Sequence, residues 1–197
     1  MKRLLIALLF ASIGSGVRLH AQPENAEPVK AGTAAAAKTP EAVIRSWPPV
    51  AQSAARAMIE KYGLPHQYGD DELVWNDIVY WRKTVVHRRG WPGRNDFLEQ
   101  TILYQVPEDN VAELKDFDRR LKVDLAKGEL SARSESEPLN FLALNLADEI
   151  LRGNRSAEDA RTIYRKTAGL AKAGKSSRYT DGLHFSGHRF MHKTYFP

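Results

Sequence analysis

Apolar residues recur at helical spacing most clearly between Ser136 and Gly153. The stripe in this stretch consists of Leu139, Leu142, Ala143, Leu146 and Ile150. Because residues three or four apart share one face of a helix, the stretch predicts an amphipathic helix that has Pro138 in its first turn and ends at Gly153.

Three weaker apolar stripes predict further helices. The first follows Ser46 and ends at Gly63, the second follows Pro107, and the third follows Ser156, with Asp159 completing a capping box. Each of these helices has one apolar face, so each must pack against another element.

Between the helices, the residue pattern is typical of strands. Asn76–Asp77 is expected to form a turn, and Gly128 is a candidate bulge. The predicted strands are 72–76, 79–88, 97–106 and 122–133. Since successive strands follow one another through short turns, we expect an α+β fold in which a small antiparallel sheet of about four strands is packed by about four helices.

The first 21 residues have the pattern of a secretory signal peptide. Lys2 and Arg3 precede a short apolar run, and small residues lead to a plausible cleavage point after Ala21. The run is shorter than the roughly 20 apolar residues of a membrane-spanning helix. We therefore expect residues 1–21 to be a signal peptide, and we expect no membrane span.

The rest of the chain divides by composition into three parts. Residues 22–40 are rich in Pro and Ala without apolar periodicity, which predicts a disordered linker. Residues 41–168 are the predicted single domain, and residues 169–197 are a basic tail that contains aromatic residues and histidines.

The chain has no cysteine, so it has no site for the lipid attached to bacterial lipoproteins and no disulfides. A periplasmic or secreted location in a bacterium fits this composition best. The net charge of +5 lies at the two ends: the signal peptide contributes +3, the tail +4, and residues 22–168 carry −2. A mildly acidic domain disfavours a nucleic-acid partner.

Three histidines stand four residues apart in the tail, at His184, His188 and His192. Two histidines at this spacing share a helix face and are able to hold a metal ion. On a helix, however, the outer two would stand about 12 Å apart, too far for bonds of about 2 Å to one zinc ion. Since Gly182 and Gly187 also disfavour a helix, we predict no metal site here.

The tail also mixes cations with aromatic side chains. Arg178, Arg189 and Lys193 alternate with Tyr179, Phe185, Phe190, Tyr195 and Phe196. This mixture suits anionic surfaces, but it equally suits aromatic side chains that dock on the acidic domain. We favour docking or flexibility over a ligand role for the tail.

Trp75, Trp81 and Trp91 fall within one strand-rich region. Exposed tryptophans on a sheet suggest a platform on which carbohydrates or peptides stack. Burial in the core is the commoner arrangement, and the sequence leaves both open.

Several groups of acids are able to supply the two carboxylates of a glycoside hydrolase. His66 and His87 are candidate bases. The acids are Asp70, Asp71 and Glu72, then Asp96 and Glu99, and finally Glu129 and Glu135. Because the sequence does not show which of these residues meet in the fold, no catalytic residue is assigned.

Sequence motifs of common enzyme classes are missing from the chain. Ser53, Ser131 and Ser134 lack the G-x-S-x-G context of a nucleophile elbow. The chain also has no Walker loop, dinucleotide fingerprint, HExxH or EF-hand sequence, so we predict no cofactor.

Five phrases of the sequence together resemble a group of uncharacterised exported bacterial proteins. The phrases are WPPVAQSAARAMIEKYGLP, LVWND, LEQTILYQVP, GELSAR and NFLALNLADEI, and they fall within residues 46–165. The resemblance implies a shared fold and an exported setting, and it implies no activity.

We therefore expect an exported α+β domain that acts as a binding or interaction module at the bacterial envelope, holding an envelope component or a small ligand. One alternative is a hydrolytic enzyme that uses acids or histidines from residues 66–99. Another is a metal-handling protein that uses the tail histidines.

Overall fold

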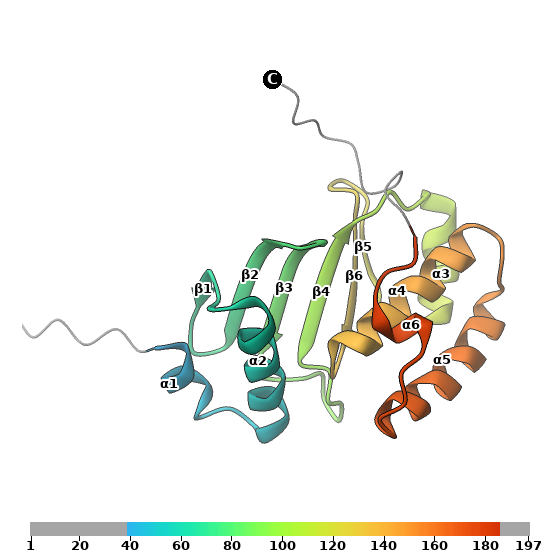
Figure 1. Ribbon diagram of the computed structural model, residues 1–197. Coiled ribbons are helices and arrows are strands. Elements are labelled where there is room, and N and C mark those ends of the chain that lie inside the picture. Colours follow the sequence, from blue (N-terminus) through green and yellow to red (C-terminus); the bar gives the residue numbers. More distant parts are fainter. Residues whose placement is uncertain (1–38, 186–197) are drawn as a thin grey trace, which may run out of the picture. The chain divides into compact units, whose positions relative to one another are not determined.

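The computed structural model describes residues 39–185, which form an α+β fold around one antiparallel sheet (Figure 1). The predicted signal peptide, nearly all of the predicted linker and residues 186–197 lie outside the described residues. The strands are β1 (Gln67–Tyr68), β2 (Glu72–Ile78), β3 (Trp81–His87), β4 (Leu98–Leu103), β5 (Lys122–Asp124) and β6 (Glu129–Ser134). The helices are α1 (Pro40–Ile44), α2 (Pro49–Tyr62), α3 (Val111–Phe117), α4 (Glu137–Leu151), α5 (Ala157–Lys172) and α6 (Arg178–Asp181), with a 3-10 turn at Glu108–Asn110.

The predicted fold class and the antiparallel sheet are confirmed, and the number of elements is higher than predicted. The described residues form six strands in the order β1-β2-β3-β4-β6-β5, and six helices. Segment 122–133 was predicted as one bulged strand, but it folds back at Gly128 (φ 63°) into the hairpin β5–β6. The other additional elements are short: β1 has two residues, α1 five and α6 four.

Two predicted boundaries are wrong. The turn between β2 and β3 lies after Ile78, not at Asn76–Asp77, because Ile78 pairs with Trp81 across the hairpin. This register places Val79 in the left-handed region (φ 54°), which is unusual for a β-branched residue. Ser46 does not cap α2, which begins at Pro49, and its hydroxyl instead donates to the carbonyl of Val43.

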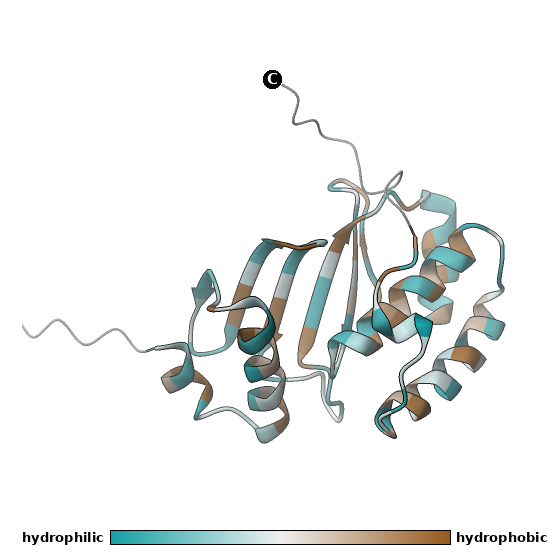
Figure 2. Cartoon of the chain, in the orientation of Figure 1, coloured by the Kyte–Doolittle hydropathy of each residue, from teal (hydrophilic) through white to brown (hydrophobic). Residues whose placement is uncertain are grey.

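Helices α2 and α4 lie side by side on one face of the sheet (Figure 1). Helix α2 packs on the β2–β3 side around the buried Trp75, and α4 packs on β4 and β6. In Figure 2 the strands carry both brown, hydrophobic stretches and teal, hydrophilic ones. The sheet therefore carries two neighbouring cores, one beneath each helix.

Helix α4 is the most enclosed element of the described chain. Helices α3, α5 and α6 pack against it on the side away from the sheet, and nearly all its residues are buried. The sequence pattern predicted that α4 buries one face. The structure instead buries α4 on nearly all sides, as is typical of a helix surrounded by protein. The buried Asn140 is satisfied by Ser134, Gln100 and the carbonyl of Leu98.

Part of the predicted tail is folded. Residues 169–172 complete α5, and the chain then returns along α4, where the side chain of Asn145 binds the carbonyls of Tyr179 and Gly182 and the amide of His184. Phe185 is buried and packs edge-on against Tyr104, with ring centroids 5.5 Å apart. The described part of the tail therefore completes the core around α4.

A buried carboxylate at the start of α4 joins the two cores. Glu137 is 5% exposed, and its Oε1 accepts hydrogen bonds from Tyr62 (2.5 Å), Trp81 (2.8 Å) and Gln100 (2.9 Å). Its Oε2 forms an ion pair with Lys61. Burial, followed by the hydrogen bond and charge of Glu137, raises the pKa of Tyr62 far above its ordinary value, so the phenol remains a donor.

Replacing Glu137 with glutamine should lower the free energy of unfolding by about 2 kcal/mol, because hydrogen bonds to a buried charge are lost and an amide faces Lys61. Denaturant titration followed by circular dichroism measures this change. The control is Glu60→Gln, since Glu60 is an exposed acid of α2, and this substitution should change stability by less than about 0.5 kcal/mol. Equal effects of the two substitutions would contradict the role of Glu137.

Candidate functional site

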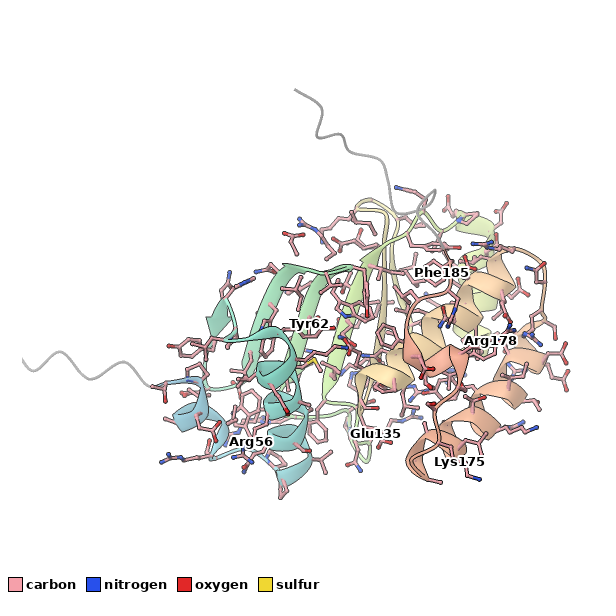
Figure 3. The ribbon with its side chains drawn as sticks, in the orientation of Figure 1. Arg56, Tyr62, Glu135, Lys175, Arg178 and Phe185 are labelled. Atoms are coloured by element: carbon pink, nitrogen blue, oxygen red, sulfur yellow. The ribbon has the colours of Figure 1, made fainter. Side chains whose placement is uncertain are left out.

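A pocket of about 260 Å³ lies where the β3–β4 loop (residues 88–97) meets the start of α4 and the last turns of α5. We call it the α4–α5 pocket. Figure 3 shows Glu135 at the start of α4 and Lys175 beyond the end of α5, at the same end of the fold. The pocket is lined by Arg94, Asn95, Asp96, Arg120, Glu135, Leu139, Tyr164, Ala168 and Lys172.

The β3–β4 loop is held in place by hydrogen bonds from β6 and within the loop. Arg133 donates to the carbonyls of Asp96 (2.8 Å) and Arg89 (2.9 Å). The amide of Trp91 donates to Oδ1 of Asp96 (2.7 Å). Gly90 permits this close packing, because a Cβ there would lie 2.4 Å from the carbonyl oxygen of Arg94.

Asp96 is the unusual residue of the pocket. It is 3% exposed, and although Oδ1 accepts the Trp91 amide, Oδ2 is buried with no hydrogen-bond partner among the described residues. A buried polar atom without a partner costs about 1–3 kcal/mol, so such atoms are rare in folded proteins. Asp96 therefore lines the pocket and has one carboxylate oxygen, buried behind the pocket surface, without a partner among the described residues.

Most other charges of the pocket are already paired. Arg120 binds Asp118 (2.6 Å) and lies 5.2 Å from the ring centroid of Tyr164, while Lys172 pairs with Glu135 (3.0 Å). Burial opposes the charge of Arg120, but Asp118 and Tyr164 together raise its pKa above the ordinary value. By contrast, Arg94 forms no ion pair with any described residue. Arg94 and the buried Oδ2 of Asp96 are thus the two charged groups of the pocket without a partner among the described residues.

The opposite face of the sheet, away from the helices, carries a second charged cluster. Glu99 on β4 lies 3.2 Å from Nε2 of His87, 2.9 Å from Lys122 and 3.7 Å from Arg133. Nδ1 of His87 lies 3.9 Å from Glu72. We call these five residues the charge ladder, since they lie next to one another across β2, β3, β4, β6 and β5.

The charge ladder is poorly suited to acid–base catalysis. Burial raises the pKa of Glu99, but the hydrogen bonds and charges of His87 and Lys122 outweigh it and hold the pKa at about 2. Both ring nitrogens of His87 face carboxylates. Glu99 is therefore ionised near neutral pH and is not a proton donor there.

The remaining predicted acids and bases lie apart from one another. Nδ1 of His66 accepts the amide of Asn76 (3.0 Å), and Glu129 lies 3.9 Å from Arg82. Asp70 and Asp71 are exposed on the turn before β2. Among the predicted acids, the structure brings Asp96 and Glu135 into one pocket and leaves the others elsewhere.

The tryptophans do not form a platform on the sheet. Trp75 is fully buried and donates to the carbonyl of Gly63, and Trp81 is 1% exposed and donates to Glu137. Trp91 is half-buried on the β3–β4 loop, 6.0 Å from the guanidinium of Arg133.

The serines that lack a nucleophile elbow have structural neighbours. Ser131 shares a hydrogen bond with Thr101 (2.8 Å), and Ser134 donates to Asn140 (2.7 Å). Ser53 lies in a groove between α2 and the start of α4.

Of the three tail histidines, only His184 is described. Its ring bonds to the carbonyl of Arg178, and its amide bonds to Asn145. Residues 39–185 contain no cluster of three or more metal-ligating side chains. His188 and His192 lie outside the described residues.

Sequence reasoning missed Arg94, Tyr164 and Lys172 as pocket residues. Arg94 and Asp96 share a Gly- and Pro-rich loop, and this composition was the one signal that pointed there. The α5 residues enter the pocket only through tertiary packing, which leaves no local pattern.

Comparisons with protein-family models, curated proteins and solved structures find no match to this chain. Within residues 39–185, no helix has the length and apolar content that a bilayer-spanning helix requires.

Glu99→Gln should lower stability at neutral pH by on the order of 2–3 kcal/mol. Because the pKa of Glu99 is lowered from 4.5 to about 2, its stabilisation is complete above pH 4.5 and is lost as the pH falls to about 2. The difference between wild type and variant should therefore shrink over that range in urea titrations. Glu72→Gln, at a half-exposed end of the ladder, is the control, and a Glu99→Gln difference independent of pH would contradict the assignment.

Proposed function

We propose that this protein is a binding module that holds a small polar ligand in the α4–α5 pocket. The observation that carries the proposal is the buried Oδ2 of Asp96, which has no partner among the described residues although its residue lines the pocket. The signal-like residues 1–21 support a setting at the bacterial envelope, periplasmic or secreted.

The pocket's size and charge favour a small ligand over a protein partner. Its volume of about 260 Å³ is slightly below the range of roughly 300–1,000 Å³ that is typical of drug-sized ligands. Three elements separated in sequence form its walls, so the backbone of these walls is in place before the ligand arrives. Preformed walls reduce the entropy lost on binding.

A hydrolytic enzyme is the second candidate, and one observation favours it: Asp96 and Glu135 line the same pocket. Glycoside hydrolysis needs one protonated and one ionised carboxyl group. Glu135 forms an ion pair with Lys172 (3.0 Å). Release of p-nitrophenol from p-nitrophenyl glycosides tests this candidate: turnover that disappears in Asp96→Asn would support an enzyme over a binding module.

The binding proposal is tested by thermal unfolding of the protein with a panel of amino acids, monosaccharides, dicarboxylates and nucleosides. A ligand at about 100 times its Kd stabilises by about 2.7 kcal/mol, which raises Tm by on the order of 5–10 °C. Ala168→Leu narrows the pocket and should remove the shift.

The control for this experiment is Ala126→Leu, which adds the same side chain on the exposed β5–β6 turn. This variant should keep the full shift. If no compound of the panel raises Tm, or if Ala168→Leu leaves the shift unchanged, the α4–α5 pocket is not the binding site.

A further inference from the structure

We infer that the ligand of the α4–α5 pocket is a free α-amino acid with an apolar side chain, whose ammonium group binds Asp96 and whose carboxylate binds Arg94. This inference rests on the proposed function and specifies its ligand class.

We infer the ammonium group of the ligand from the carboxylate of Asp96. A carboxylate accepts hydrogen bonds at both oxygens, and here one oxygen is used by the Trp91 amide while the other is buried without a partner. The neighbouring cations do not compensate it, since Lys172 pairs with Glu135 and Arg120 with Asp118. A small cationic donor is therefore the group that this oxygen lacks, and charge-assisted hydrogen bonds are the strong ones.

The carboxylate follows from Arg94, which lies two residues before Asp96 on the same loop. Its side chain is exposed and forms no ion pair with a described residue. A guanidinium presents a planar fork of donors that matches a carboxylate. Both residues line the α4–α5 pocket, so the pocket contains one cationic and one anionic side chain, which complement the two charges of an α-amino acid.

We infer the apolar side chain of the ligand from the apolar residues that α4 and α5 contribute to the pocket. Leu139 of α4 and Tyr164 and Ala168 of α5 also line the pocket. A volume of about 260 Å³ suits one residue better than a longer peptide.

Oδ2 is shielded from solvent. Binding therefore includes a turn of the Asp96 carboxyl group toward the pocket. The backbone of Asp96 stays anchored meanwhile, because Arg133 holds its carbonyl at 2.8 Å.

The test compares L-leucine with two partial ligands by isothermal titration of the full chain. L-leucinamide keeps the ammonium group and lacks the carboxylate, and 4-methylpentanoate keeps the carboxylate and lacks the ammonium group. L-leucine should bind at least about tenfold more tightly than either, because each lost contact is a charge-assisted hydrogen bond.

Two variants assign each group to its residue. Asp96→Asn should weaken L-leucine and L-leucinamide about tenfold and leave 4-methylpentanoate unchanged, while Arg94→Gln should weaken L-leucine and 4-methylpentanoate and leave L-leucinamide unchanged. Arg165→Gln, an exposed position of α5 outside the pocket lining, is the control and should change nothing. If Asp96→Asn does not fold, the three ligands on the wild-type protein still decide the question.

The outcomes separate this inference from the proposed function. Equal affinities for the three ligands, or Asp96→Asn with unchanged L-leucine affinity, would overturn the amino-acid assignment. A panel compound without an ammonium group whose binding is lost in Ala168→Leu would overturn this inference and leave the proposed function standing. If neither L-leucine nor any panel compound binds, both fail.

Discussion

The structure depends first on the buried carboxylate of Glu137. Moving a carboxylate out of water is costly unless hydrogen bonds replace the lost solvation. Here the donors come from α2, β3 and β4, through Lys61, Tyr62, Trp81 and Gln100. The elements that carry these donors, α2, β3 and β4, also contribute buried apolar residues to the two cores. Glu137 therefore fixes where α4 starts relative to the sheet, and the start of α4 is one wall of the α4–α5 pocket.

The charge ladder supports the same pocket from the other face of the sheet. Glu99 gathers His87, Lys122 and Arg133 across neighbouring strands. Arg133 reaches beyond the ladder and holds the carbonyl of Asp96. A salt bridge at the surface contributes little on its own, whereas partly buried charges in a network contribute more. Because Arg133 belongs to the charge ladder and also binds the β3–β4 loop, the pairing of the strands helps to fix the position of Asp96.

Patterns in the sequence predicted the helices and helix caps that depend on neighbouring residues. They missed the features that depend on tertiary packing, namely the β2–β3 turn and the α4–α5 pocket. Periodicity identified α4, and the residue types before α5 identified its Ser156 N-cap, because apolar stripes and caps act over a few residues. The β2–β3 turn was misplaced because Trp81, anchored on Glu137, selects a register that puts Val79 at positive φ. Asp96 and Glu135 were among the acids named from the sequence. Their meeting in one pocket depends on where α4 packs, which no local pattern records.

A crystal structure of the protein crystallised with L-leucine would show Oδ2 of Asp96, the one oxygen on which the proposed function depends. We predict that the ammonium nitrogen of L-leucine lies within hydrogen-bond distance of this oxygen and that its carboxylate lies at the guanidinium of Arg94. Oδ2 bound instead to an ordered water, with the α4–α5 pocket empty of L-leucine, would contradict it.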